Sequence, residues 1–113
     1  MKVVRQRLSN KHKNNEFCTA VEYPTGDKDI SVALIELNGR YPSNGMVLNE
    51  KCKELAYVIK GSGKLVIENK EVPLGEGDLV SIDPGEKYFW DGNMTLLMPC
   101  APAWYPEQHK EME

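Results

Sequence analysis

The chain has few cysteines, two histidines and no long apolar run, and these shortages exclude several classes of protein. No apolar segment is long enough to cross a bilayer as a helix, so we expect no membrane partner. Cys18, Cys52 and Cys100 are far apart and form no Cys-x-x-Cys pair, which excludes a zinc ribbon or redox motif of that spacing. Their odd number, without an apolar signal segment, predicts a reducing, cytoplasmic location.

Positive charge is not in excess either. Lysine and arginine number 14 against 17 aspartate and glutamate residues, and the net charge is -3. Nucleic-acid binding needs clustered positive charge, so we expect no nucleic-acid partner. A length of 113 residues with 41% hydrophobic and 27% charged residues predicts one domain, residues 1–113, with a core that needs no disulfides.

Turn residues between short apolar runs are what the sequence has in abundance. From Gly61 to Gly85 they recur at intervals of roughly eight to twelve residues, with Val, Ile and Leu between them. This rhythm is typical of an all-β sandwich or barrel. The expected strands are residues 2–8, 17–23, 30–37, 46–53, 54–60, 65–68, 71–74, 78–82, 88–90 and 94–98.

The connections are predicted from turn chemistry. Asn69-Lys70 and Asp91-Gly92 are expected to close hairpins, because asparagine and glycine tolerate the positive φ that such turns need. Residues 9–16 and 38–45 are expected to be loops. Prolines at 99, 102 and 106 should prevent regular ladder pairing, so the tail is expected to be irregular or to end in a short helix at 106–111.

Two segments carry the spacing of a known family. Residues 54–61, Glu-Leu-Ala-Tyr-Val-Ile-Lys-Gly, match the E-x6-G half of the first cupin motif. Residues 77–88 follow the second, G-x5-P-x-G-x2-H-x3-N, with Asp83 at its first proline, Gly85 at its glycine and Tyr88 at its histidine. The chain therefore resembles the cupin family over roughly residues 40–100. The resemblance implies a double-stranded β-helix, the small jelly-roll barrel.

The resemblance also implies a metal site of three histidines and one carboxylate, and here the chain departs from the family. Counted back from Glu54, the histidine positions of the first motif fall on Leu48 and Glu50, and that of the second motif falls on Tyr88. Late first-row metals prefer imidazole ligands, so we expect no metal and no cofactor.

A register shifted by one residue does not restore the site. It places Val47 and Asn49 at the two positions of the first motif, and these are no better ligands. The two histidines of the chain, His12 and His109, lie outside both motifs.

Five residues are expected to line a ligand pocket. Strand alternation groups Leu48, Glu50 and Glu54 on one face, and Tyr88 and Trp90 on another. The family geometry implies that these faces meet inside the barrel.

Four interpretations of this lining stay open. Glu50 bonds Tyr88 or Lys87 and closes an inert barrel, or Glu50, Glu54 and Tyr88 orient a polar ligand against Trp90. The paired carboxylates can also act as acid and base, or hold a hard cation.

The sequence thus predicts a metal-independent barrel that binds a small, sugar-like or polar metabolite. The alternative is an enzyme. It is either an acid–base isomerase or epimerase that uses Glu50, Glu54 and Tyr88, or a metal-dependent, dioxygenase-like cupin with an atypical carboxylate site. Catalytic residues are not assigned.

A homodimer is expected from the exposed sheet edges of such a barrel. Residues 2–8 are expected to add to a partner's sheet, and Phe17, Trp104 and Tyr105 to supply apolar area. Trp104 and Tyr105 are otherwise expected to pack over a barrel mouth or sheet face, with a ligand lid as the alternative. Cys52 is expected to be a small buried hydrophobic residue.

Overall fold

The all-β fold class is confirmed. The computed structural model describes residues 1–113, with nine strands and two single-turn 3₁₀ helices, η1 (Gln6–Leu8) and η2 (Pro106–Gln108). The strands are β1 (Asn10–Asn15), β2 (Cys18–Glu22), β3 (Ser31–Tyr41), β4 (Met46–Asn49), β5 (Lys53–Ile67), β6 (Lys70–Leu74), β7 (Leu79–Ile82), β8 (Tyr88–Ala101) and β9 (His109–Met112). Neither helix has the length or the hydrophobicity to span a membrane.

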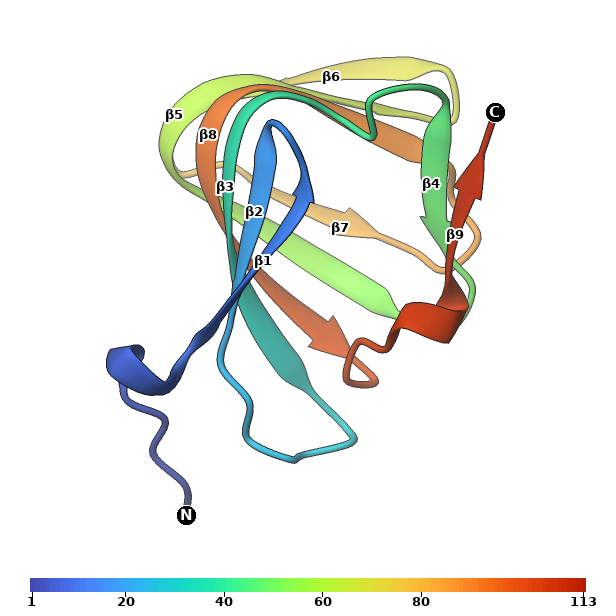
Figure 1. Cartoon of the computed structure of the whole chain (residues 1–113). Coiled ribbons are helices and arrows are strands. Elements are labelled where there is room, and N and C mark those ends of the chain that lie inside the picture. The colour runs from blue at the N-terminus through green and yellow to red at the C-terminus, as the bar shows by residue number, and fades with distance from the viewer.

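The strands form one antiparallel sheet that curls into a barrel (Figure 1). Its order is β1-β2-β3-β8-β4-β9, and β5 pairs with β8 and carries β6 and β7 along its other edge. Figure 1 shows β3, β5 and β8 curving together along one side, while β4 and β9 stand on the opposite side. The interior therefore lies between the central strands and this β4–β9 pair.

β5 and β8 are the two longest strands, and each runs through a position where the sequence predicts a break. The predicted interruption near Gly61 and the predicted hairpin at Asp91-Gly92 are both wrong. A Cβ atom on Gly61 would collide with the carbonyl oxygen of Asn93, and one on Gly92 would collide with the Cα of Gly63. These glycines allow two backbones to approach closely within a ladder, which is a second role of glycine in strands.

The first strand, β1, is polar, and the sequence predicts a loop at residues 9–16 instead. β1 pairs with β2 from Asn10↔Glu22 to Asn15↔Cys18, and its residues are exposed except for the half-buried Asn15. Residues 2–8 do not form the predicted strand and contain the η1 turn instead. Because β1 forms through hydrogen bonds to β2 rather than through burial, apolar alternation gives no signal for it.

Two further boundaries differ from the prediction. The β5–β6 hairpin turns at Glu68-Asn69, one residue early, and these residues have φ values of 46° and 66°. Pro99 does not end the strand. β8 continues to Ala101 because Pro99 lies where its pairing with β5 is interrupted, between the pairs that Cys100 and Leu97 make.

The tail also differs from the prediction, since no helix spans residues 106–111. The η2 turn ends at Gln108, and β9 then pairs antiparallel with β4 from Asn49↔His109 to Met46↔Met112. The tail therefore supplies part of the barrel wall.

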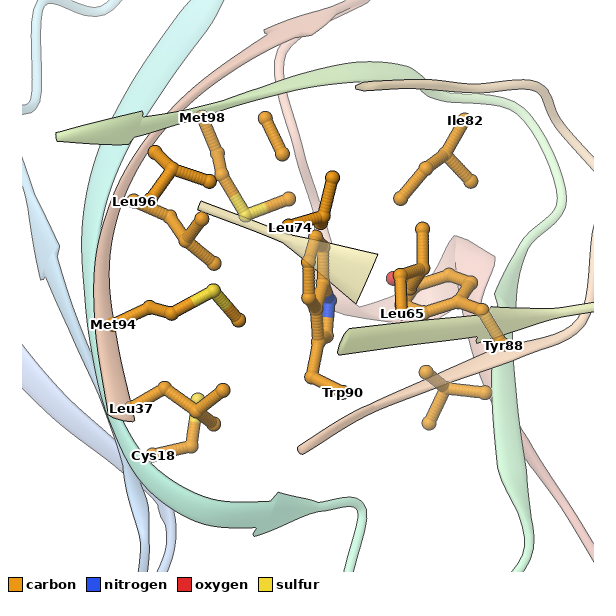
Figure 2. Close-up of a cluster of buried hydrophobic side chains, with 13 residues drawn as sticks. Cys18, Leu37, Leu65, Leu74, Ile82, Tyr88, Trp90, Met94, Leu96 and Met98 are labelled. Carbon is orange, nitrogen blue, oxygen red and sulfur yellow. The ribbon is translucent and has the colours of Figure 1, made fainter. Parts of the chain in front are cut away.

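Thirteen buried residues from β2 to β8 fill the interior (Figure 2). Figure 2 shows Trp90 in the middle of the cluster, with its indole nitrogen turned toward the side on which Leu65 and Tyr88 lie. The full set is Cys18, Leu37, Val47, Ala56, Val58, Leu65, Leu74, Ile82, Tyr88, Trp90, Met94, Leu96 and Met98. The polar residues that are buried with them define the candidate site.

Candidate functional site

The face that β4 turns inward decides which residues occupy the cupin motif positions. Val47 and Asn49 are buried, Leu48 is half-buried, and the side chain of Glu50 is 50% exposed. The prediction that Leu48 and Glu50 line the interior is therefore wrong. One more residue separates Asn49 from Glu54 than the motif count assumes, and a one-residue slip moves every side chain of a strand to the other face.

Glu50 instead belongs to the outer wall. Its carboxylate lies 4.0 Å from the ammonium group of Lys110, the neighbour of Leu48 on β9. It bonds neither Tyr88 nor Lys87, so the inert-barrel interpretation based on those bonds is wrong. Glu50 and Glu54 also do not face one another as a carboxylate pair, which removes the predicted cation site and acid–base pair built on both.

Glu54, near the start of β5, is the buried carboxyl group of the site. The side-chain amide of Asn49 donates to its Oε1 at 2.6 Å, and the hydroxyl of Tyr88 donates to the same oxygen at 3.5 Å. Burial raises the pKa of Glu54, and the hydrogen bonds from Asn49 and Tyr88 offset part of the rise. The carboxyl group therefore holds a proton more readily than one in water does.

The amide orientations around Glu54 follow from the hydrogen bonds. The backbone N–H groups of Lys51 and Cys52 donate to Oε1 of Gln108, at 3.2 and 3.1 Å. Nε2 of Gln108 is therefore the end that donates to Oδ1 of Asn49, at 2.9 Å. Asn49 must then present its own amide nitrogen to Glu54. The chain of donors runs in one direction, from the backbone to the carboxyl group.

His109 extends the network toward the surface. Its Nδ1 lies 2.8 Å from Oδ1 of Asn49, and its Nε2 lies 3.2 Å from the hydroxyl of Tyr41. Because Oδ1 of Asn49 is an acceptor, Nδ1 carries the proton, and Nε2 of the neutral ring accepts from Tyr41. Burial lowers the pKa of His109, and burial also raises the pKa of Tyr41 to about 12. Both groups are neutral in this arrangement.

Trp90 and Tyr88 bring two aromatic rings to the same interior. Their ring centroids are 6.4 Å apart, and the planes meet at 79°. Trp90 is 4% exposed, yet its indole N–H donates to no protein atom. Every side-chain nitrogen or oxygen that is fully shut off from solvent has a partner, so this N–H keeps contact with open space. The same holds for Oε2 of Glu54, since both of its hydrogen bonds use Oε1.

The structure thus brings together three of the five predicted lining residues, namely Glu54, Tyr88 and Trp90. Their role in binding a ligand stays a prediction. Sequence reasoning missed Tyr41, Asn49, Gln108 and His109 as members of the site. Asn49 falls on a motif position only in the shifted register, and the hydrogen bond between Asn49 and His109 spans 60 residues. No local motif can indicate a contact of that length.

The residues at the four metal-ligand positions of the family do not fit a transition metal. Val47 has no donor atom, Asn49 and Tyr88 offer an amide and a phenol, and Glu54 is the one strong ligand. No group of three or more His, Cys, Asp or Glu side chains is placed to hold a metal ion.

The two remaining features near the site are sulfur and aromatic groups. Cys52 and Cys100 are free and buried, and burial raises the pKa of both thiols, which disfavours the reactive thiolate. Trp104 lies against His109 with ring centroids 5.6 Å apart, and its backbone N–H donates to Oγ of Ser31. A ligand-lid role for Trp104 stays a prediction.

Solved structures share this fold over the whole chain. Streptomyces PAC13, crystallised as a variant with uridine, has a TM-score of 0.91 at 18% identity, covering 100% of this chain and 91% of that one. Ectoine synthase from P. lautus has a TM-score of 0.74 at 14% identity, with coverage of 100% and 91%. KdgF from Halomonas sp. has a TM-score of 0.71 at 11% identity, with coverage of 89% and 94%. At these identities the likeness shows the fold alone.

The sequence itself carries the family assignment. A search of curated proteins finds no match. Residues 35–97, more than half of the chain, match the family profile described as a cupin domain. That range contains β4, β5 and β7, the strands that hold Asn49 and Glu54 and the turns of both motifs. The chain belongs to the cupin family, as its E-x6-G segment and its Asp83-Pro84-Gly85 turn imply.

Proposed function

We propose that the barrel binds a small polar metabolite with several hydroxyl groups, such as a sugar or a nucleoside, without a transition metal. One observation carries the proposal. Oε2 of Glu54 and the indole N–H of Trp90 belong to buried residues, bond no protein atom and keep contact with open space. Buried polar groups are rarely left without a partner, so such groups are the natural contacts of a ligand or of water.

The chemistry of the lining favours hydroxyl-bearing rings. A hydroxyl group can donate to one of these groups and accept from another, whichever protonation state Glu54 holds. The rings of Tyr88 and Trp90 offer apolar surface beside the polar groups, which suits the faces of a sugar or a base. PAC13, the barrel of the same shape that was crystallised with uridine, supports this class of ligand.

The binding test uses the fluorescence of Trp90. In a Trp104→Phe background, Trp90 is the one remaining indole, and its emission reports contacts to its N–H. We expect uridine or a monosaccharide from a panel to change this emission in a saturable way. A ligand at about 100 times its Kd should also stabilise the fold by about 2.7 kcal/mol. Glu54→Gln should weaken binding at least tenfold, whereas Glu50→Gln, on the outer wall, should leave it unchanged. An equal loss of affinity in both variants would contradict a binding site at Glu54 and Trp90.

Acid–base catalysis is a second candidate function, favoured by the continuous network. The donors run from Tyr41 through His109 and Asn49 to Glu54, and the Glu54 carboxyl group is one whose pKa lies above its ordinary range. A carboxyl group whose pKa is raised toward the working pH is suited to exchange a proton with a bound molecule. PAC13 is described as a nucleoside dehydratase, so a barrel of this shape can support catalysis.

Isotope exchange distinguishes a catalyst from a binder. A reducing monosaccharide incubated with the protein in D₂O loses its C2–H signal in the NMR spectrum if an enzyme removes that proton. We expect wild type to accelerate the loss and Glu54→Gln to reduce the rate about 100-fold or more. Binding of the same sugar without loss of its C2–H signal would contradict the catalytic function and support binding alone.

A reducing, cytoplasmic location is proposed on the state of the cysteines. Cys18, Cys52 and Cys100 are all free and buried. Small domains exposed to oxidising conditions commonly use disulfides, and this one uses none.

A further inference from the structure

The barrel interior contains a buried acid but no buried base. Three buried residues are polar or charged, namely Asn49, Glu54 and Gln108, and none of them is basic. Of the 14 lysine and arginine residues, 12 are exposed, and the remaining two, Arg40 and Lys64, are half-buried. A buried carboxyl group is commonly paired with a basic side chain, so the absence of one beside Glu54 bears on which ligands the site can take.

Strand alternation explains why the basic side chains stay outside. Four residues of the site each have a basic neighbour in the sequence, and the pairs are Arg40-Tyr41, Lys53-Glu54, Lys87-Tyr88 and His109-Lys110. Successive side chains of an extended chain point to opposite faces, so a residue that faces inward turns its neighbour outward. Positive charge is therefore placed around the barrel, one residue away from the site on each segment, without entering it.

The two half-buried basic side chains are held outside by contacts of their own. The guanidinium group of Arg40 lies 3.9 Å from the centroid of the Phe89 ring and donates to two backbone carbonyl groups of residues 42–45, at 2.6 and 2.9 Å. The ammonium group of Lys64 pairs with Glu71 at 2.9 Å. Each would lose these contacts if it turned inward, so neither supplies positive charge to the interior.

The charges that act on the site from nearby are negative. Burial is the main cause that raises the pKa of Tyr41 to about 12, and the carboxylates of Glu111 and Glu54 add to the rise. Burial lowers the pKa of His109, and Glu111 opposes that shift. No lysine or arginine shifts the pKa of either group. An anionic ligand would therefore meet like charge and no counter-ion, and both weaken binding.

The hydrogen-bond donors of the site do not form an anion site either. The amide nitrogen of Asn49 and the hydroxyl of Tyr88 both donate to Glu54. The indole N–H of Trp90 remains as a donor that bonds no protein atom. Proteins bind phosphate and carboxylate groups with several convergent N–H donors or with a guanidinium group. One indole N–H suits a hydroxyl or carbonyl oxygen instead.

We propose that the barrel selects its ligand by charge, accepting the uncharged form of a sugar or nucleoside and rejecting the phosphorylated or acidic form. The inference rests on the proposed function, because it concerns the ligand of the same site. It narrows the ligand class from polar metabolites to those without a negative group. Nucleotides, sugar phosphates and sugar acids are excluded, and free sugars and nucleosides remain.

Glucose, glucuronate and the methyl ester of glucuronic acid separate charge from size. Glucuronate carries a carboxylate where glucose has a hydroxymethyl group, and the ester removes that charge while adding bulk. Isothermal titration calorimetry at pH 8 is expected to give similar Kd values for glucose and the ester. The Kd of glucuronate should be about 100-fold higher, the factor expected for two like charges about 6 Å apart at an effective dielectric constant of about 20. Uridine should likewise bind more tightly than uridine 5′-phosphate.

Two matched variants test whether Glu54 is the source of the selection. Glu54→Gln removes the buried acid and should lower the ratio of the glucuronate Kd to the glucose Kd at least tenfold. Glu50→Gln removes an acid from the outer wall, where its carboxylate lies 4.0 Å from Lys110, and should leave the ratio unchanged. Circular dichroism checks that both variants are folded. A ratio that Glu54→Gln leaves unchanged would overturn the proposal.

The same measurements distinguish failure of the charge selection from failure of the proposed function. Glucuronate or uridine 5′-phosphate that binds as tightly as its neutral counterpart would overturn the charge selection and leave the proposed function standing. An ester that is rejected as strongly as glucuronate would also overturn it, because size would then be the cause. If neither glucose nor uridine nor any other neutral sugar or nucleoside of the panel binds, the proposed function fails, and the charge selection fails with it.

Discussion

Asn49 is the residue through which the whole polar network passes. Its amide nitrogen donates to Glu54, while its oxygen accepts from both Gln108 and His109. An amide can do both at once, whereas a carboxylate only accepts and a histidine offers one group of each kind at a different spacing. The position at which the family's motif has a metal-binding histidine is thus occupied by the side chain that a metal-free network needs.

Replacing this amide should be costly. Asn49→Asp removes the donor to Glu54 and sets two acidic groups side by side. We expect a loss of about 1–3 kcal/mol of unfolding free energy at neutral pH, the penalty for an unsatisfied buried partner. The loss should shrink as pH falls, because a proton shared by the two carboxyl groups restores a hydrogen bond. Urea unfolding at pH 5 and pH 7 measures both values. A loss that is the same at both pH values would contradict the predicted repulsion.

The raised pKa of Glu54 makes a second prediction, on the pH dependence of stability. The folded state binds the Glu54 proton more tightly than the unfolded state, whose value is near the ordinary 4.5. The stabilisation is therefore complete below that value and is lost as pH rises through the folded pKa. The unfolding free energy of wild type minus that of Glu54→Gln should therefore fall as pH rises.

The pKa shift of His109 changes stability with pH in the opposite direction. Its pKa is lowered from 6.5, so its contribution is present above that value and is lost as pH falls through the folded pKa. Because His109 is present in both proteins, its effect largely cancels in the difference. Glu50→Gln serves as the surface control and should show no comparable trend. A rising difference would mean that the folded state favours the charged Glu54.

At the scale of the element, strand alternation predicted which residues of β5 and β8 face inward, but it did not predict β4, the course of β8 or β1. Alternation identified the inward residues Glu54, Tyr88 and Trp90, because one face of each strand is buried. It failed on β4, where the motif count was one residue out. It failed again at Asp91-Gly92, because glycine permits either a turn or the close approach of a second strand, and the sequence does not show which. β1 was missed because it buries almost nothing.

Two glycines with the same backbone angle separate these roles. Gly61 and Gly77 both have φ of 87°, but a Cβ on Gly61 would overlap the Asn93 carbonyl oxygen, whereas one on Gly77 would meet nothing within 4 Å. Gly77→Ala should cost only the left-handed strain of about 1–2 kcal/mol. Gly61→Ala should cost about 2–3 kcal/mol more, because the β5–β8 ladder must also shift. Thermal or urea unfolding measures the stability of both variants. Equal losses of unfolding free energy would mean that β8 moves away from residue 61 without an energetic penalty.

For the molecule as a whole, the sequence specified the architecture better than the site. The turn spacing and the motif glycines and prolines predicted the jelly-roll barrel, because those residues govern local backbone geometry. The site depends on a strand pair between β4 and β9 that no local pattern encodes. The single-domain organisation and the homodimer stay predictions. The absence of the histidine triad, by contrast, was readable directly from the sequence.

That absence predicts the response of the whole protein to metal removal. With Asn49 and Tyr88 both bonded to Glu54, we expect well under one equivalent of Fe, Mn, Ni, Cu or Zn in the purified protein. Chelation should then leave the Tm unchanged, because no metal-binding free energy supports the fold. Elemental analysis and a melting curve with EDTA measure both quantities. A stoichiometric metal whose removal lowers the Tm would revive the metalloenzyme alternative.

The β4–β9 pair has one more consequence, which concerns the order of events during synthesis. Chains emerge from the ribosome N-terminus first, at about 5–20 residues per second. Residues 10–101 contain β1 to β8 and precede His109, so β9 is the last strand of the wall to be synthesised. Without β9, β4 lacks its main partner strand, and Asn49 lacks its hydrogen bonds to Gln108 and His109. We therefore expect the polar network around Glu54 to be completed late in folding, when β9 docks against β4.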